Sequence, residues 1–208
     1  MSEHADDTGP TSDGAKPESE RAGIPDLDDE YLDGVARRLA YNYDLRSDDR
    51  FDGEQFDLYG RMTIRNQKHF LHPSLSFARH ELAEHLFARR ASTVRRANLD
   101  RLVSLGHELA DRWIDADEHH YSTDFTFVLV AEAIDEGLAE YVAGFSDRTM
   151  LSYGFHGHYE VNLAVVLPES EEAVASPGAD VVEAFRLWTP IEREEPGLFQ
   201  LITRRLQL

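Results

Sequence analysis

The chain of 208 residues is long enough for one domain of ordinary size with flanking segments, and too short for two full domains. It holds 40 acidic and 21 basic residues, and a formal net charge of −19 argues against a general binder of nucleic acids or anionic membranes. The absence of cysteine excludes disulfides, thiolate metal ligands and cysteine nucleophiles. Because high salt screens self-repulsion, so acidic a composition is typical of a halophilic source.

Residues 1–27 are rich in Ser, Asp, Glu, Gly and Pro and contain almost nothing apolar, so we expect a disordered acidic tail. A basic start followed by an apolar run, the mark of a secretory signal, is not seen there. No stretch approaches the roughly 18 consecutive apolar residues of a transmembrane helix. We therefore expect a cytoplasmic protein without a transmembrane segment.

The first helix is predicted to begin at Asp28 or Asp29, either of which can cap it, and to end near Tyr43. Apolar residues recur along it at helical spacing and form one buried stripe, which consists of Leu32, Val35, Ala36 and Leu39.

The next part of the chain is predicted to be a charged loop over residues 47–54, a strand over 55–64 and a second strand over 68–72. Residues 76–90 fit a helix best, although apolar residues at its start also alternate as they would in a strand. The residues at helical spacing are Leu82, Ala83, Leu86 and Phe87. A longer helix is predicted over residues 93–114.

Residues 121–168 contain the two most apolar runs of the chain, at 124–130 and 159–167, with an amphipathic helix at 135–145 between them. This pattern predicts a strand, a helix and a strand, and so a βαβ-like unit with two parallel strands. The long connection before the last strand leaves room for a short extra strand near residues 149–153.

Residues 169–208 are predicted to be an acidic linker followed by a C-terminal amphipathic appendage. In this appendage an apolar stripe lies beside two arginines; it consists of Leu198, Leu201, Ile202 and Leu206, with Arg204 and Arg205. Such a segment can dock on its own domain, on a protein partner or on a lipid surface, and docking on its own domain is the simplest interpretation. We thus predict a single α+β domain over residues 28–168, with a mixed sheet of four or five strands packed by helices.

A histidine-rich rim is the best candidate site. In an extended segment His156, His158 and Glu160 project to the same side, because side chains alternate with a period of two. If the two strands are parallel neighbours, His119 and Asp124 lie at the same edge of the sheet. These five residues are therefore candidate ligands of a divalent metal.

Two observations argue against a metal site at this rim. Open parallel sheets bind ligands outside the carboxyl ends of their strands, and this rim is the amino end. Residues 154–157 also read as a simple turn, which would leave the histidines solvated.

The string His80-Glu81-Leu82-Ala83-Glu84-His85 resembles a zinc-protease signature and departs from it, because Glu84 stands where a second histidine is needed. On a helix, His80 and Glu84 would share one face and could hold a metal, although a solvated pair is the simpler interpretation. His107 is expected to be a satisfied histidine at the edge of the core.

A cluster of arginines interrupts the acidity; it consists of Arg89, Arg90, Arg95, Arg96 and Arg101. Arginine forks suit phosphate, so a nucleotide or nucleic-acid contact is one hypothesis for this cluster. The chain has no glycine-rich phosphate loop beside it. Pairing with neighbouring carboxylates is therefore favoured, and nucleic-acid binding is not expected.

Three stretches, residues 56–62, 120–127 and 153–160, make the chain resemble an uncharacterised domain family of halophilic archaea. The resemblance covers about residues 31–169. It implies no known activity, so it brings no catalytic residue to this sequence.

Two functions of different class remain open. The favoured one is a non-enzymatic interaction or regulatory module, because no catalytic motif is intact and the C-terminal amphipathic helix offers contact with a protein partner. The alternative is a metal-dependent, hydrolase-like enzyme that uses the histidine-rich rim.

Overall fold

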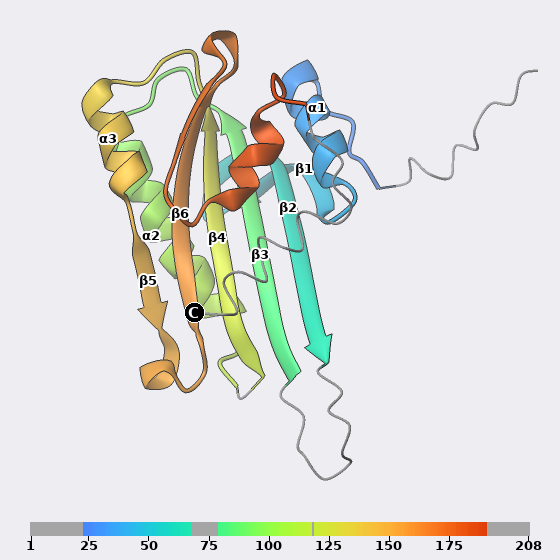
Figure 1. Cartoon of the computed structure of the whole chain (residues 1–208), viewed down its shortest axis with the longest axis vertical. Coiled ribbons are helices and arrows are strands. Elements are labelled where there is room, and N and C mark those ends of the chain that lie inside the picture. The colour runs from blue at the N-terminus through green and yellow to red at the C-terminus, as the bar shows by residue number, and fades with distance from the viewer. Residues whose placement is uncertain (1–22, 68–78, 118, 191–208) are drawn as a thin grey trace, which may run out of the picture.

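The computed structural model describes residues 23–67, 79–117 and 119–190. These residues form one α+β domain in which a seven-stranded mixed sheet lies between two layers of helix. Six strands follow the order β1-β2-β3-β4-β6-β5, and β7 pairs with β6. Figure 1 shows α1 and the last helical turn on one face of the sheet, and α2 and α3 on the other.

The chain enters the sheet through α1 (Glu30–Leu39) and the antiparallel pair β1 (Asp44–Phe51) and β2 (Glu54–Gln67). Asp29 caps α1, because its side chain accepts hydrogen bonds from the backbone amides of the first turn. The turn between β1 and β2 is Asp52-Gly53, and both residues have positive φ, as a tight hairpin turn requires.

The centre of the sheet is parallel. β3 (Arg79–Arg90) pairs antiparallel with β2, and α2 (Arg96–Trp113) then crosses the sheet to β4 (His120–Val130), which runs parallel to β3. α3 (Glu136–Gly144) leads on to the last part of the sheet.

The last part of the sheet is built around β6 (His158–Leu167), which runs parallel to β4. β5 (Asp147–Met150) pairs with the first half of β6, and β7 (Glu172–Ala175) pairs with its second half. Three short 3-10 turns complete the described chain: η2 (Leu151–Gly154), η3 (Pro168–Ser170) and η4 (Asp180–Phe185).

Each face of the sheet has its own apolar core. Beneath α2 and α3 the core is rich in aromatic rings, among them Phe87, Phe125 and Phe127. Beneath α1 and η4 it is aliphatic, with Leu86, Val128 and Ala164 of the sheet. Because both faces are covered, the central strands are apolar on both sides.

The structure confirms the α+β class and the βαβ-like unit, since β4 and β6 are parallel neighbours joined through α3. The predicted number of four or five strands is too low. The predicted helix over residues 76–90 is wrong, because residues 79–90 form β3, and the predicted loop over 47–54 lies largely in β1. The strand expected at residues 68–72 falls outside the described residues.

The two wrong elements have physical causes. β3 sends apolar side chains to both cores, so its pattern loses the alternation of a one-sided strand and imitates a helix. β1 lies at the edge of the sheet and buries only Leu45 fully, so its sequence looks like a charged loop.

The packed domain continues beyond residue 168. β7 extends the sheet, and η4 buries Val181, Val182 and Phe185 in the aliphatic core. Both elements lie in the segment for which an acidic linker was expected.

Candidate functional site

Three carboxylates lie side by side across the middle of the sheet. Glu84 of β3 is the register partner of Asp124 of β4, which is in turn the register partner of Glu160 of β6. Register partners on parallel strands project to the same face, so the three side chains form one row, here called the acidic row. Its ends are extended by Met62 of β2 and Arg148 of β5.

The acidic row lies on the face that carries α1 and η4. Leu86, Thr126 and Asn162, two residues further along the same strands, occupy the next level on this face. Leu86 already belongs to the aliphatic core under α1 and η4, which continues beyond this level. The acidic row thus marks the border between the covered, carboxyl half of this face and its amino half.

Exposure differs along the row. The side chains of Glu84 and Asp124 are partly exposed, whereas Glu160 is 8% exposed. Three apolar side chains next to the row, Met62, Ile64 and Leu82, are also partly exposed. The surface at the row therefore combines negative charge with apolar area.

Tyr43 covers one end of the row. Its ring lies over Gly60 of β2, where an added Cβ would stand 3.1 Å from the ring atom Cδ1. Burial raises the pKa of the Tyr43 hydroxyl well above its usual range, and the charge of Glu84 and a hydrogen bond to it raise it further. The hydroxyl is therefore protonated and donates to Glu84. The charges of Asp124 and Asp180 act on it in the same direction.

The other end of the row contacts a guanidinium group and an imidazole ring. Arg148 Nε donates to Glu160 Oε1 at 2.7 Å, and His158 Nε2 lies 3.4 Å from the same oxygen. Arg148 itself remains more than half exposed. The row thus already accommodates one guanidinium at its β5 end.

Gly178 brings a loop onto the row from the covered side. A Cβ at this position would lie 2.2 Å from Asn162 Oδ1 and 3.0 Å from Glu160 Oε2, so only glycine allows this approach. Beneath the loop, Thr126 is 0% exposed and Asn162 is 3% exposed. Among the described residues, Thr126 Oγ1 and Asn162 Nδ2 have no hydrogen-bond partner.

Of the five residues predicted as metal ligands, the structure brings three to the same region: His158, Glu160 and Asp124. His156 lies in the turn before β6, where its Nδ1 is 3.0 Å from Ser152 Oγ. His119 is exposed, and its backbone amide donates to Asp117. In the described parts of the chain, no three His, Cys, Asp or Glu side chains are grouped to hold a metal ion. The metal site stays a prediction.

Two other histidines have structural partners. His120 Nδ1 donates to the carbonyl of His156 at 2.7 Å, so its Nε2 accepts from the Thr123 hydroxyl at 2.9 Å. His107 connects α2 to the sheet, with Nδ1 3.0 Å from the Tyr159 hydroxyl and Nε2 3.2 Å from Asp147 Oδ2. The expectation of a satisfied His107 at the edge of the core is confirmed.

The suspected pair of His80 and Glu84 does not form the helical ligand pair. Both residues belong to β3, and positions four apart in a strand are separated by about 13 Å. The likeness to a zinc-protease signature therefore has no counterpart in the fold.

The arginine cluster is paired with carboxylates, as the sequence favoured. Four of its five members form ion pairs: Arg89 with Glu54, Arg90 with Asp29, Arg96 with Asp100, and Arg101 with Glu54 and Glu108.

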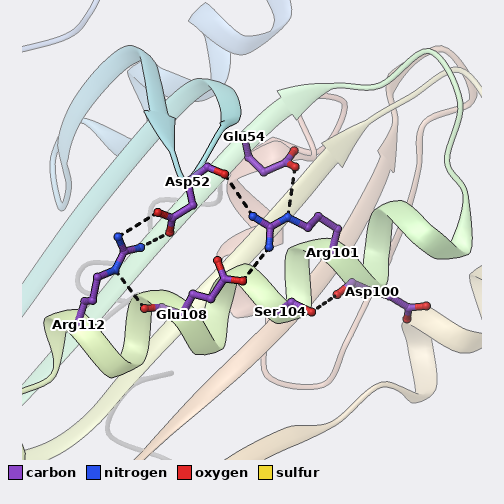
Figure 2. A network of polar contacts seen from close by, with 7 residues as sticks. All are labelled: Asp52, Glu54, Asp100, Arg101, Ser104, Glu108 and Arg112. Atoms are coloured by element: carbon purple, nitrogen blue, oxygen red, sulfur yellow. Dashed lines mark hydrogen bonds and ion pairs between the residues drawn. The ribbon is translucent and has the colours of Figure 1, made fainter.

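Part of this network fixes α2 to the hairpin of β1 and β2 (Figure 2). Arg101 donates from Nη1 to Glu108 at 2.9 Å and from Nη2 to the carbonyl of Asp52 at 3.2 Å. About three turns further along α2, Arg112 Nη1 donates to Asp52 Oδ1 at 3.0 Å. These guanidinium groups hold the hairpin turn against the helix, which is a structural role.

Sequence reasoning considered Glu84 only as a helical partner of His80 and did not place it beside Asp124, and it missed Tyr43. The prediction of a helix over residues 76–90 removed Glu84 from the sheet, and Tyr43 was taken as the end of a helix. One signal was present: Asp52-Gly53 is a strong hairpin turn, and it predicts strands on both sides. With β1 and β2 in place, β3 becomes the natural third strand.

The fold defines a single α+β domain with a mixed sheet, an acidic row on one face and, among the described residues, no helix long and apolar enough to cross a membrane. The chain belongs to the family described as Domain of unknown function (DUF8052), whose model matches residues 28–187. No curated protein matches the chain, and no solved structure does.

Proposed function

We propose that the domain is a non-enzymatic interaction module that binds an arginine-bearing segment of a protein partner on the acidic row. The observation that carries the proposal is the register of Glu84, Asp124 and Glu160, which places three carboxylates at one level on three adjacent strands.

The chemistry of the row fits guanidinium. Neighbouring strands are about 4.8 Å apart, so one guanidinium fork can reach the carboxylates of two adjacent strands. Arg148 already donates to one carboxylate of the row, that of Glu160, from within the fold. Glu84 and Asp124 are the partly exposed members and offer the contact to a partner.

The surroundings of the row specify the partner further. Met62 and Ile64 on β2 and Leu82 on β3 provide partly exposed apolar area next to Glu84. An ion pair that is partly covered by such side chains is screened less by salt than an exposed one. The matching ligand is therefore an amphipathic segment that has arginine beside apolar side chains.

Neutralising the exposed part of the row should weaken binding at least tenfold. The variant combines Glu84→Gln with Asp124→Asn, and the probe is a fluorescein-labelled peptide in which two arginines are flanked by leucines. Its affinity is measured by fluorescence anisotropy at a KCl concentration at which the protein is folded. A tenfold loss corresponds to about 1.4 kcal/mol, which is close to the lower end of the range for one charge-assisted hydrogen bond.

The matched control for this variant combines Glu132→Gln with Glu140→Gln, since both carboxylates are exposed and lie outside the row, Glu132 after the carboxyl end of β4 and Glu140 on α3. It changes the net charge by the same amount and should leave the affinity unchanged. Equal losses in both variants would mean that the peptide senses only the overall charge, and the proposal would be wrong.

A second candidate function is metal-assisted hydrolysis, with His156, His158 and Glu160 as ligands and His119 or Asp124 in support. The observation that favours it is the proximity of His158 Nε2 to Glu160 Oε1, at 3.4 Å, with Asp124 on the adjacent strand. A divalent ion there would compete with Arg148 for Glu160.

Metal content separates the two candidates. If the rim is a metal site, protein purified at high KCl contains about one equivalent of metal, and the double variant His156→Ala, His158→Ala contains none. Metal-free wild-type protein that also fails to take up zinc, manganese or magnesium on dialysis would rule out this candidate. The interaction module predicts that peptide binding is unaffected by a chelator.

A further inference from the structure

The last thirteen residues of the sequence, which follow Glu192, Glu194 and Glu195, have the composition that the acidic row is proposed to bind. Residues 196–208 contain two arginines and no acidic residue, in a chain with 40 acidic and 21 basic residues. The arginines, Arg204 and Arg205, stand among apolar residues, namely Leu198, Leu201, Ile202 and Leu206. Charge and apolar character are therefore combined in this segment as they are combined on the sheet.

The last described residues also lie on the face of the sheet that carries the acidic row. Arg38 of α1 donates from Nη1 to the carbonyl of Arg186 at 2.8 Å and from Nη2 to that of Thr189 at 3.0 Å. The Tyr31 hydroxyl donates to the carbonyl of Phe185. These bonds fix residues 185–189 against α1, on the same side of the sheet as the acidic row (Figure 1).

The length of chain is sufficient. Arg204 lies fourteen positions after Pro190, a length of about 46 Å when extended and about 21 Å when helical. α1 contacts β2, and β6 lies three strands further, which is about 14 Å across the sheet. The extended length therefore exceeds the width of the row severalfold, and the helical length also exceeds it.

We propose that residues 196–208 are an intramolecular ligand of the acidic row, with Arg204 and Arg205 on Glu84 and Asp124 and the apolar residues on Met62, Ile64 and Leu82. The inference rests on the proposed function, because it names the segment that the row binds. Attachment to the same chain gives the segment an effective concentration of the order of millimolar. A partner must therefore displace it, which makes the segment a built-in competitor.

The absence of cysteine allows a direct test on the full chain. A spin label on Thr203→Cys should broaden the amide NMR signals of the residues around Glu84, Asp124 and Glu160. Adding Arg204→Gln and Arg205→Gln should remove most of this broadening, because the charged contact is lost. The matched control adds Arg37→Gln and Arg50→Gln, two exposed arginines on α1 and β1, and should keep the broadening.

Mixing experiments separate the possible outcomes. Broadening within one chain that is absent when spin-labelled and isotope-labelled chains are mixed supports the inference. Broadening seen only between mixed chains overturns it, and leaves the row as a binding surface for a second copy. No broadening in either sample also overturns it, and the proposed function is then decided by the peptide titration alone. If the inference is correct, Arg204→Gln with Arg205→Gln also strengthens binding of the added peptide.

Discussion

Between pH 6.5 and pH 4 the protein is expected to lose about 3 kcal/mol of its unfolding free energy through His85 alone. Burial lowers the pKa of His85 from 6.5 to about 4, and the positive charge of Arg61 acts in the same direction. The folded state therefore keeps the ring neutral, while the unfolded state takes up a proton near pH 6.5. This contribution is fully present above pH 6.5 and is lost as the pH falls to about 4.

The surroundings of His85 explain the low pKa. The residue is 6% exposed, and its ring stacks on Phe125 at 5.2 Å between centroids and lies 4.9 Å from the Trp113 ring. Its Nδ1 is 2.8 Å from the Tyr59 hydroxyl, which satisfies the neutral ring. Burial and the positive charge of Arg61 both act against protonation, so a proton on this ring would add an unfavourable buried charge.

Urea unfolding at several pH values checks this prediction. In His85→Phe the fall of the unfolding free energy between pH 6.5 and 4 should be smaller by about 3 kcal/mol than in the wild type. The variant also loses the partner of Tyr59, which lowers stability at every pH, so the pH dependence is compared rather than the absolute value. The control His119→Gln, at an exposed histidine, should retain the wild-type dependence. Parallel curves for wild type and His85→Phe would contradict the prediction.

Gly157→Ala is expected to destabilise the fold by about 3 kcal/mol or more. Gly157 has φ of +75°, and an added Cβ would stand 2.1 Å from the carbonyl oxygen of Tyr121 and 2.7 Å from its carbon. Both atoms are backbone, and the neighbouring residues Ser122 and His158 are register partners of β4 and β6. Relief of the clash would therefore separate the first pair of the two central strands.

The denaturation midpoint of Gly157→Ala can be compared with that of Gly144→Ala. Gly144 is the last residue of α3 and has no atom within 4 Å of an added Cβ. Alanine there should be neutral or stabilising by up to about 1 kcal/mol. If both variants had the same stability as the wild type, the close approach of Gly157 to Tyr121 would not exist in solution.

Much of the fold is readable from local patterns. α1 and α2 follow from apolar stripes at helical spacing, and Asp29 was recognised as a possible cap. β4 and β6 follow from long apolar runs, and the helix between them predicts that they are parallel.

The errors arise in one strand that is buried on both faces and in one edge strand that buries little. In β3, Leu86 belongs to the aliphatic core and Phe87 to the aromatic one. Consecutive residues are therefore apolar, and the strand lacks the alternation that would have distinguished it from a helix. In β1, the strand is defined by pairing with β2 rather than by its own apolar content. Such strands can be assigned only together with their neighbours.

The candidate site shows the same limit. The projection of His158 and Glu160 to the same face of the sheet was predictable, because it depends only on the alternation of side chains within one strand. The contribution of Glu84 depends on the register between β3 and β4, and that of Tyr43 on the packing of its ring over Gly60. Neither relation is encoded in the spacing of residues along the chain.

The acidic row is proposed to be a binding surface, and an NMR titration tests this proposal most directly. The isotope-labelled chain carries Arg204→Gln and Arg205→Gln, so that its own segment does not compete, and the leucine-flanked arginine peptide is added. We predict that the largest amide shift changes occur at Glu84 and Asp124 and at their neighbours on β3, β4 and β6. Saturable changes confined to another surface, or none at all, would contradict the claim.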